Sequence, residues 1–318
     1  MTDIHIVQSP EWGEFKAQMG TSPVRVGDIQ FTKHPIPFTP FYIGYAPKVN
    51  FLIQKFSWTE LKAVAKAEKC ILIRFDVPNV LKPTYENQHV QKLLIDLRKR
   101  CKKSPKSTFP KHTVMMDISK TEDELISQMD QKTRYNVRLG ARQGIEVRLE
   151  NNEEAINIFS NLMNETAKRQ GFLAHSKRYY EKVLEVLSSH NMANLLIAYH
   201  ENKPLAAWML FNYKNTLYYP YGASTADNRN LKASNLLAWE AIKYGKRLGC
   251  TQFDMWGAKD DKSSDGWGFT KFKLSYGGEL VEFIDSYDFI INPLIYYPFN
   301  LAYGGFWKIL KGILRLRR

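Results

Sequence analysis

Basic side chains are the residues of this sequence whose type and spacing could most directly do chemistry. Arg134, Arg138 and Arg142 recur every four residues beside Lys132, so a helix would place the three arginines on one face. Such a stripe suits a phosphate backbone, with an affinity that ignores base sequence and falls with salt. A solvated helix face is the competing interpretation, because acidic residues 122–124 near the start of the same predicted helix complement its dipole.

A second basic pair lies in GFTKFKLSYGGEL, residues 268–280, beside aromatic residues and two adjacent glycines. We expect this stretch to be too short for a helix. From spacing alone, Lys273 is then typical of an exposed strand lysine with Phe272 in the core. Asp76 ends the apolar stretch ILIRFD shortly before a proline, where a carboxylate is usually a turn residue.

Several classes of site find no support in the sequence. It contains no Ser/His/Asp or Cys/His set, Walker loop, dinucleotide fingerprint or HExxH pattern, which are the signatures of hydrolases, NTPases, dehydrogenases and zinc proteases. Cys70, Cys101 and Cys250 stand singly without CxxC spacing, so no disulfide framework or zinc site is predicted. We expect a reduced compartment, no metal and no cofactor.

Composition limits the class of protein and its partners. The chain has 318 residues, 44% of them hydrophobic, a length that favours two domains. Its 45 basic and 32 acidic residues give a net charge of +13, which favours polyanionic partners such as RNA, DNA, nucleotide phosphates or an anionic membrane. Its start has no secretory pattern and no apolar stretch reaches about 18 residues, so we expect a cytoplasmic protein.

Strand and helix patterns alternate along the chain. The first part predicts strands at 24–31, 41–44 and 70–75 and helices at 59–68 and 88–100. KRCKKSPKSTFPKH, residues 99–112, has the composition of a domain boundary. The second part predicts a strand at 113–117, a helix at 121–143, a strand at 146–149, helices at 153–170 and 176–189, strands at 193–199, 206–213 and 216–223, a helix at 234–248 and a strand at 252–256.

The order of elements in the second part resembles an acyltransferase of the GNAT type. In acyl-CoA enzymes the turn before the long helix is rich in glycine, so that backbone N–H groups can hold a pyrophosphate. Here that turn opens the stretch STADNRNLKASNLLAWEAI, which contains no glycine. Side chains at those positions obstruct close backbone approach, so we expect a donor other than coenzyme A.

Five motifs in one order resemble the Fem family (FemA/FemB/FemX-like), aminoacyltransferases that add amino acids from aminoacyl-tRNA to the stem peptide of peptidoglycan precursors. The motifs are QSPEWGEFK at 8–16, LIRFD at 72–76, DQKTRYNVRLGARQGIEV at 130–147, YPYGAS at 219–224 and FKLSYGGE at 272–279. The resemblance implies an α/β (α+β) fold of two GNAT-like domains in tandem, with mixed, mostly antiparallel sheets flanked by helices, in the short form without a coiled-coil arm. Residues 1–110 plus 290–318 would bind the precursor, and 111–289 would hold the aminoacyl-tRNA side.

The resemblance also implies roles for individual residues. Transfer from an RNA ester to an amine passes through an oxyanion and releases a ribose alkoxide, so a positioned cation would suffice as catalyst. Phe272 and Lys273 match the family's Phe-Lys pair at the tRNA acceptor end. Asp76 matches a cleft aspartate that would orient or deprotonate the attacking amine. The cations of residues 132–142 would contact the tRNA.

For the precursor, the resemblance implies contacts by Lys16, Tyr179 and Tyr221. The two tyrosines are equally consistent with half-buried packing residues. The family's arginine is absent: His175 takes its place, and a histidine cannot form the bidentate phosphate fork of an arginine. Diphosphate recognition would then differ, or the acceptor would be the lipid-linked precursor, lipid II, rather than the soluble UDP-MurNAc-pentapeptide.

The C-terminal residues 305–318 combine cationic and apolar positions at helical spacing. They would either lie against an anionic membrane at its inner face or cap the first domain.

Three functions remain open on the sequence. We favour transfer from aminoacyl-tRNA to the stem-peptide amine of a peptidoglycan precursor, with no DNA as partner. The alternatives are a GNAT-fold N-acyltransferase with an acyl-CoA or acyl-carrier donor, and an inactive membrane- or RNA-binding relative.

Overall fold

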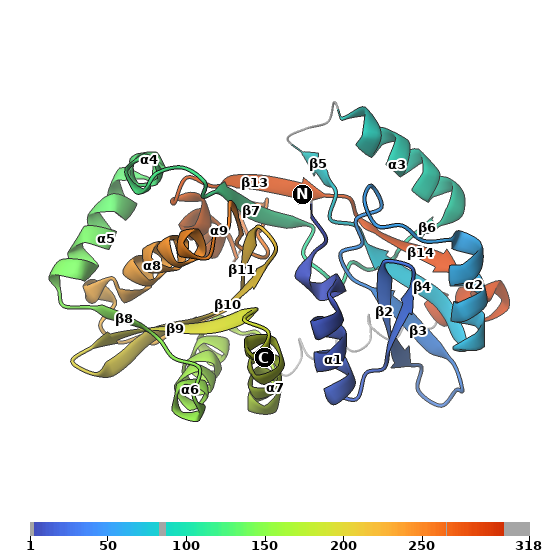
Figure 1. Ribbon diagram of the computed structural model, residues 1–318, viewed down its shortest axis with the longest axis horizontal. Helices are drawn as coiled ribbons and strands as arrows, with labels where there is room; N and C mark the ends of the chain where they lie inside the picture. The colour runs from blue at the N-terminus through green and yellow to red at the C-terminus, as the bar shows by residue number, and fades with distance from the viewer. Residues whose placement is uncertain (1–2, 83–86, 265, 302–318) are drawn as a thin grey trace. The chain divides into compact units, whose positions relative to one another are not determined.

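The computed structural model describes residues 3–82, 87–264 and 266–301, which form two compact units (Figure 1). The first comprises the described parts of Met1–Ser9, Gly20–Phe109 and Phe283–Arg318, and the second comprises Pro10–Met19 and Pro110–Glu282. Two segments differ from the predicted division. Residues 10–19, and Pro110 at the boundary, belong to the second unit rather than the first, and residues 283–289 belong to the first rather than the second.

A six-stranded sheet in the order β1-β2-β3-β4-β14-β6 is the centre of the first unit. Its strands are β1 (Pro23–Val26), β2 (Ile29–Pro35), β3 (Tyr42–Ala46), β4 (Cys70–Asp76), β6 (Lys102–Lys103) and β14 (Ser286–Ile290), and a short β5 (Val80–Lys82) follows β4. The single strand predicted over 24–31 is instead the β1–β2 hairpin. Gly27 turns it with φ +56°, and a Cβ there would lie 2.5 Å from the Lys55 carbonyl oxygen. β14 lies antiparallel to β4, so the chain returns to the first unit after completing the second.

Helices cover both faces of this sheet. They are the 3-10 helix η1 (Ile6–Gln8), α2 (Trp58–Ala67), α3 (Gln88–Arg100) and a helix over residues 293–301. Ser57 and Asn87 cap α2 and α3 by accepting hydrogen bonds from first-turn amides. α2 and α3 pack in the core that contains Phe75, whereas Tyr296 of the last helix packs in a separate cluster on Leu72.

The second unit holds a larger mixed sheet that includes seven strands in the order β13-β7-β12-β11-β10-β9-β8. These are β7 (His112–Asp117), β8 (Glu146–Leu149), β9 (Ala193–His200), β10 (Lys203–Tyr213), β11 (Thr216–Ser224), β12 (Gln252–Asp254) and β13 (Glu279–Phe283). All neighbours among them are antiparallel except β11 and β12, which are parallel.

Helices flank the sheet of the second unit on both sides, α4, α5 and α8 on one and α6 and α7 on the other (Figure 1). The helices of this unit are α1 (Pro10–Gln18), α4 (Glu122–Gln128), α5 (Gln131–Arg142), α6 (Glu153–Gln170), α7 (Lys177–Ser189), the 3-10 helix η2 (Arg229–Leu231), α8 (Ala233–Arg247) and α9 (Trp267–Leu274). None of the helices within the described ranges has both the length and the apolar composition needed to cross a bilayer.

Two predictions about helices were wrong. The helix expected over 121–143 is divided, because Met129 and Asp130 adopt extended backbone angles between α4 and α5. Glu122, Asp123 and Glu124 therefore begin α4, with a capping box at Thr121, and do not share a helix with the arginines. The stretch at 268–280, expected to be too short for a helix, contains most of α9, whose residues pack around the turn that follows β12.

Candidate active site

Lys273 is a buried cation near the end of α9. It is only 7% exposed, in contrast to the solvent-exposed strand lysine that spacing alone predicts. Its Nζ donates to the carbonyl oxygen of Gly257 at 2.7 Å and to that of Met255. The ring centroids of Phe269 and Tyr219 lie 4.9 and 5.4 Å from the same atom. Two carbonyls and two aromatic faces thus fix the position of the ammonium group.

The turn after β12 presents these carbonyls. Trp256 and Gly257 both have positive φ, +54° and +93°, and the Trp256 amide donates to Asp254 Oδ1 at 2.8 Å. Asp254 is 2% exposed and also accepts from the Thr113 hydroxyl. Burial lowers the pKa of Lys273 to about 8, and the nearby charge of Asp254 opposes that shift. The ammonium form therefore predominates at neutral pH but is readily deprotonated.

A cavity of about 380 Å³ opens beside Lys273. Its walls include Phe272, Trp208, Tyr219 and Trp256, and Trp208 stacks on Tyr219 with ring centroids 3.6 Å apart. Such walls suit a planar or apolar group next to a fixed positive charge.

A second cavity of about 350 Å³ shares Gln170, Ser224, Ser234 and Phe272 with the first. Its lining adds three cations, Arg169, Arg229 and Lys232. It lies at the turn before α8, where Asn228 and Lys232 both adopt left-handed backbone angles. The two cavities together are therefore lined by aromatic residues near Lys273 and by cationic residues near the start of α8.

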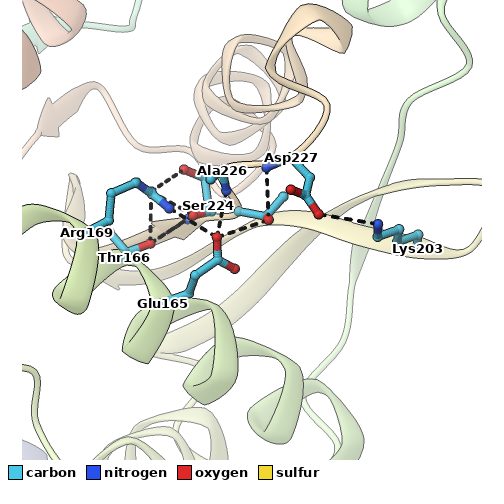
Figure 2. A network of polar contacts seen from close by, with 8 residues as sticks. Glu165, Thr166, Arg169, Lys203, Ser224, Ala226 and Asp227 are labelled. Atoms are coloured by element: carbon cyan, nitrogen blue, oxygen red, sulfur yellow. Dashed lines mark hydrogen bonds and ion pairs between the residues drawn. The ribbon is translucent and has the colours of Figure 1, made fainter.

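Side chains of α6 form hydrogen bonds with the backbone of this turn, as Figure 2 shows. Arg169 donates to the Ser224 carbonyl oxygen at 2.8 Å, and Glu165 accepts from the Ala226 amide at 2.7 Å. Thr166 accepts from the Ser224 amide at 3.0 Å, and the Asp227 amide donates to Thr225. The amides that a glycine-rich turn would offer to a pyrophosphate are thus already engaged at Ser224, Ala226 and Asp227.

Lys16 and the three other residues predicted to bind the precursor come together in the second unit. Lys16 Nζ lies 5.9 Å from the Tyr179 ring centroid, and the Tyr179 hydroxyl is 2.9 Å from that of Tyr221. The His175 ring stacks on Tyr179 at a centroid distance of 3.9 Å and an angle of 12°. α1 supplies Lys16 and α7 supplies Tyr179, and Phe15 packs edge-on against Tyr179 between them.

Both titratable bases of this cluster are shifted toward their neutral forms. Burial lowers the pKa of Lys16, and partial desolvation followed by the Lys16 charge lowers the pKa of His175, although its ring remains exposed to solvent. At neutral pH the cluster therefore offers one ammonium and mainly neutral imidazole and phenol groups.

Asp76 belongs to the first unit, at the end of β4. It is 5% exposed, and its two carboxylate oxygens accept from the hydroxyls of Tyr45 on β3 and Ser286 on β14. Burial, and then the Asp76 charge, raise the pKa of Tyr45 well above its usual range. The carboxylate thus joins three neighbouring strands.

The basic stripe lies on α5. Arg138, Arg142 and Lys132 are exposed, but Arg134 is half-buried and donates to the Met129 carbonyl and, at 3.1 Å, to that of Ser127. Arg134 therefore stabilises the C-terminal end of α4, and the exposed positive charge comes from the other three residues.

Several residues of the two cavities were missed from the sequence. Trp208, Tyr219 and Trp256 look like ordinary core aromatics in their strand patterns. Arg229 and Lys232 stand in the glycine-free turn, which we used only as evidence against coenzyme A. Two cations immediately before a long helix were the available signal.

Known proteins resemble both the sequence and the fold. Residues 127–265 match the Acetyltransferase (GNAT) domain family. A lipid II:glycine glycyltransferase of Staphylococcus epidermidis is 26% identical, over 86% of this chain and 82% of its own length, and that of Staphylococcus aureus is 24% identical, over 92% and 89%. The crystal structure of FemX covers 92% of this chain and 94% of its own, with a TM-score of 0.79 and 21% identity.

These matches confirm the resemblance to the Fem family and the tandem GNAT-like fold. The C-terminal residues 305–318 lie outside the described residues. The chain is an acyltransferase of tandem GNAT-like fold that resembles the Fem aminoacyltransferases.

Proposed function

We propose that this enzyme transfers an amino acid from an aminoacyl-tRNA to the stem-peptide amine of a peptidoglycan precursor, with lipid II as the acceptor. Relatives at 24–26% identity named lipid II:glycine glycyltransferase support the acceptor class. The observation that carries the reaction type is the buried Lys273 ammonium, held by two carbonyls beside an aromatic cavity.

In this reaction the acceptor amine attacks the ester carbonyl carbon and the C–O bond to ribose breaks. The products are an amide and a tRNA with a free ribose hydroxyl, and the proton lost by the amine balances the one gained by the ribose oxygen. Two of the three Lys273 N–H donors engage carbonyls of the described residues, which leaves one for the oxyanion. A pKa near 8 suits an ammonium group that also donates a proton to the leaving alkoxide.

The cavities suggest how the donor would bind. The terminal base or the aminoacyl group would lie against Trp208 and Tyr219, and the adjoining phosphates would meet Arg229 and Lys232. The exposed cations of α5 would add contacts to the tRNA backbone that depend on salt rather than on sequence.

For the acceptor, the proposed contacts are Lys16, Tyr179, Tyr221 and His175, which already form one cluster. A single ammonium with phenol donors suits a diphosphate that is also held elsewhere, as a lipid-linked precursor is held by its membrane. Asp76 is proposed as a positioning residue for its three strands rather than as a base, because both of its oxygens already accept hydrogen bonds.

The alternative donor, acyl-CoA, is favoured by the GNAT domain match and disfavoured by the engaged amides of the turn before α8. A thermal-shift titration with coenzyme A tests it. A clear rise in Tm would revive that alternative.

The decisive experiment incubates purified protein with each radiolabelled aminoacyl-tRNA and either lipid II or UDP-MurNAc-pentapeptide, and follows the mass of the precursor. We expect addition of an aminoacyl residue to lipid II with one or a few of the tRNAs. Failure with every aminoacyl-tRNA and both acceptors, using folded protein, would exclude this function.

A further inference from the structure

The helix over residues 293–301 in the first unit exposes an apolar outer face. Leu294 is 87% exposed, Leu301 84% and Tyr297 51%. Their spacing of three and four residues places them on one side of the helix. Pro293 and Pro298 are the other exposed residues of this helix, so no charged side chain interrupts the face.

The inner side of the same helix is also apolar. Tyr296 is 1% exposed and packs with Ile71 and Leu72, and Phe299 packs against that cluster. Asn300 is the one amide side chain among residues 293–301, and a helix that is otherwise hydrophobic around its circumference is normally enclosed by protein or by lipid. The sequence around this helix also lacks acidic residues. Residues 289–307 contain no charged residue, and residues 308–318 contain basic but no acidic residues.

Lys102 borders this face, and it belongs to a basic segment of the chain, residues 98–103. The C-terminal turn of α3 ends with Arg98, Lys99 and Arg100, and β6 follows with Lys102 and Lys103. All five residues are exposed, but Arg100 pairs with Asp96 and lies over the Trp58 ring of α2, and Lys103 pairs with Asp285. β6 pairs with β14, the strand that leads into the helix, and Lys102 Nζ lies 4.9 Å from the centroid of the Tyr297 ring. Lys102 is thus in direct contact with the apolar face.

The turn between β2 and β3 packs against the same apolar cluster as this helix. Ile36 and Phe41 at its ends pack in the cluster that holds Tyr296. Between them Phe38 is fully exposed and adopts φ +62°, an unfavourable backbone for an aromatic residue. A strained, exposed phenylalanine near an apolar helix is a further element that lipid would cover.

We propose that the apolar face of residues 293–301 and Lys102 at its edge form a docking surface for an anionic lipid bilayer. Leu294, Tyr297 and Leu301 would enter the boundary between headgroups and acyl chains, while Lys102 contacts lipid phosphate. A bilayer is favoured over a protein partner because the exposed residues of this helix carry no charge, and the charged residue that contacts its apolar face, Lys102, is a cation. The surface belongs to the first unit alone, and the proposal does not depend on the transfer reaction.

Vesicle flotation of the full chain tests the proposal. We expect binding to vesicles of phosphatidylglycerol with phosphatidylcholine, weaker binding at high salt, and little binding to phosphatidylcholine alone. Leu294→Glu should lower the partition coefficient at least about tenfold, since a leucine leaves the lipid and a charge replaces it. The matched control is Leu173→Glu, which changes a leucine that is 99% exposed in the second unit and should bind as the wild type does.

A charge variant separates the two components of the surface. Lys102→Gln should weaken binding to anionic vesicles several-fold and reduce its salt dependence. Absence of wild-type binding, or equal binding by Leu294→Glu and the wild type, would overturn the proposal.

A fluorescent probe distinguishes other occupants of the face. The native cysteines are buried, so a Leu294→Cys variant can be labelled there with an environment-sensitive dye. We expect the attached dye to emit at the wavelength typical of a probe in water. Its emission should shift to shorter wavelength when anionic vesicles are added. Blue emission before vesicles are added would show that residues 302–318 or a second copy of the chain already cover the face, and sedimentation would separate those two cases. Either result would overturn the proposal.

Activity gives an independent readout. Leu294→Glu should keep wild-type turnover with the soluble precursor if that acceptor is used at all, because its side chain lies in neither cavity. Loss of vesicle binding without loss of turnover would therefore support the docking surface, whereas absence of turnover in the wild type would count only against the proposed function.

Discussion

Two lysines of the second unit both lie over aromatic rings but differ in their hydrogen-bond acceptors. Lys273 is buried against two carbonyl oxygens, whereas Lys16 is half-buried over the rings of Trp12, Phe15 and Tyr179. Burial lowers the pKa of both. Carbonyl acceptors fix an ammonium group in position, while aromatic faces stabilise its charge without using its N–H donors. The first arrangement suits a fixed oxyanion, and the second suits an anionic group that arrives with the substrate.

The largest expected effect is on Lys273. Lys273→Met should lower kcat about 100- to 1,000-fold, because a preorganised oxyanion donor is lost. Lys271→Met is the matched control, since Lys271 is exposed on the same helix two residues away and should retain near wild-type kcat. Single-turnover transfer measures both variants. Comparable activity of the two would contradict the role of Lys273.

Lys16 should affect binding rather than turnover. Lys16→Met removes a desolvated charge proposed to meet the acceptor, so we expect KM for the acceptor to rise about tenfold with kcat nearly unchanged. Steady-state kinetics with the acceptor varied at saturating aminoacyl-tRNA gives the two constants. A fall in kcat alone would contradict the assignment of Lys16 to acceptor binding and Lys273 to catalysis.

The α5 stripe should matter less, and only on the donor side. Arg138→Gln with Arg142→Gln should raise KM for the aminoacyl-tRNA several-fold and flatten its dependence on salt, because two phosphate contacts are lost. KM for the acceptor should not change. If the salt slope is unaltered, the stripe is a solvated helix face.

Replacing His175 tests whether a second positive charge beside Lys16 strengthens binding of the acceptor. Its pKa is lowered, so the imidazole is largely neutral at pH 7.5 and gains charge only as the pH falls below its ordinary value. His175→Arg supplies a permanent charge and should lower KM for UDP-MurNAc-pentapeptide a few-fold at pH 7.5. The wild type should approach the variant as the pH is lowered. Equal KM values across the pH range would exclude a charge role at this position.

The smallest expected effect concerns stability. The pKa of Lys273 is about 8 in the folded protein and near 10.5 when exposed, so the unfolded chain binds more protons between these values. The free energy of unfolding should therefore rise with pH across that window, by about 1 kcal/mol between pH 7 and pH 9. Lys273→Met should lack this increment. Denaturant titrations of both proteins at the two pH values measure it, and identical slopes would count against a depressed pKa.

Local patterns predicted most of the secondary structure. α3 and α6 have the predicted bounds because Asn87 and Asn152 mark their starts with capping side chains and apolar residues recur at helical spacing. The patterns failed where tertiary contacts prevail. α9 forms although its sequence predicts no helix, since Lys273 and Thr270 bind the backbone of the turn after β12.

The sequence by itself determined the order of elements, the Fem-like motifs and the residues proposed for the precursor, because motif chemistry and local periodicity are written in neighbouring residues. Only the tertiary structure decided that Lys273 is buried, that α1 belongs to the second unit and that the Asp76 oxygens are occupied. It also decided that side chains of α6 engage the amides before α8. Burial and hydrogen-bond partners arise from residues far apart in the chain, so no local pattern specifies them.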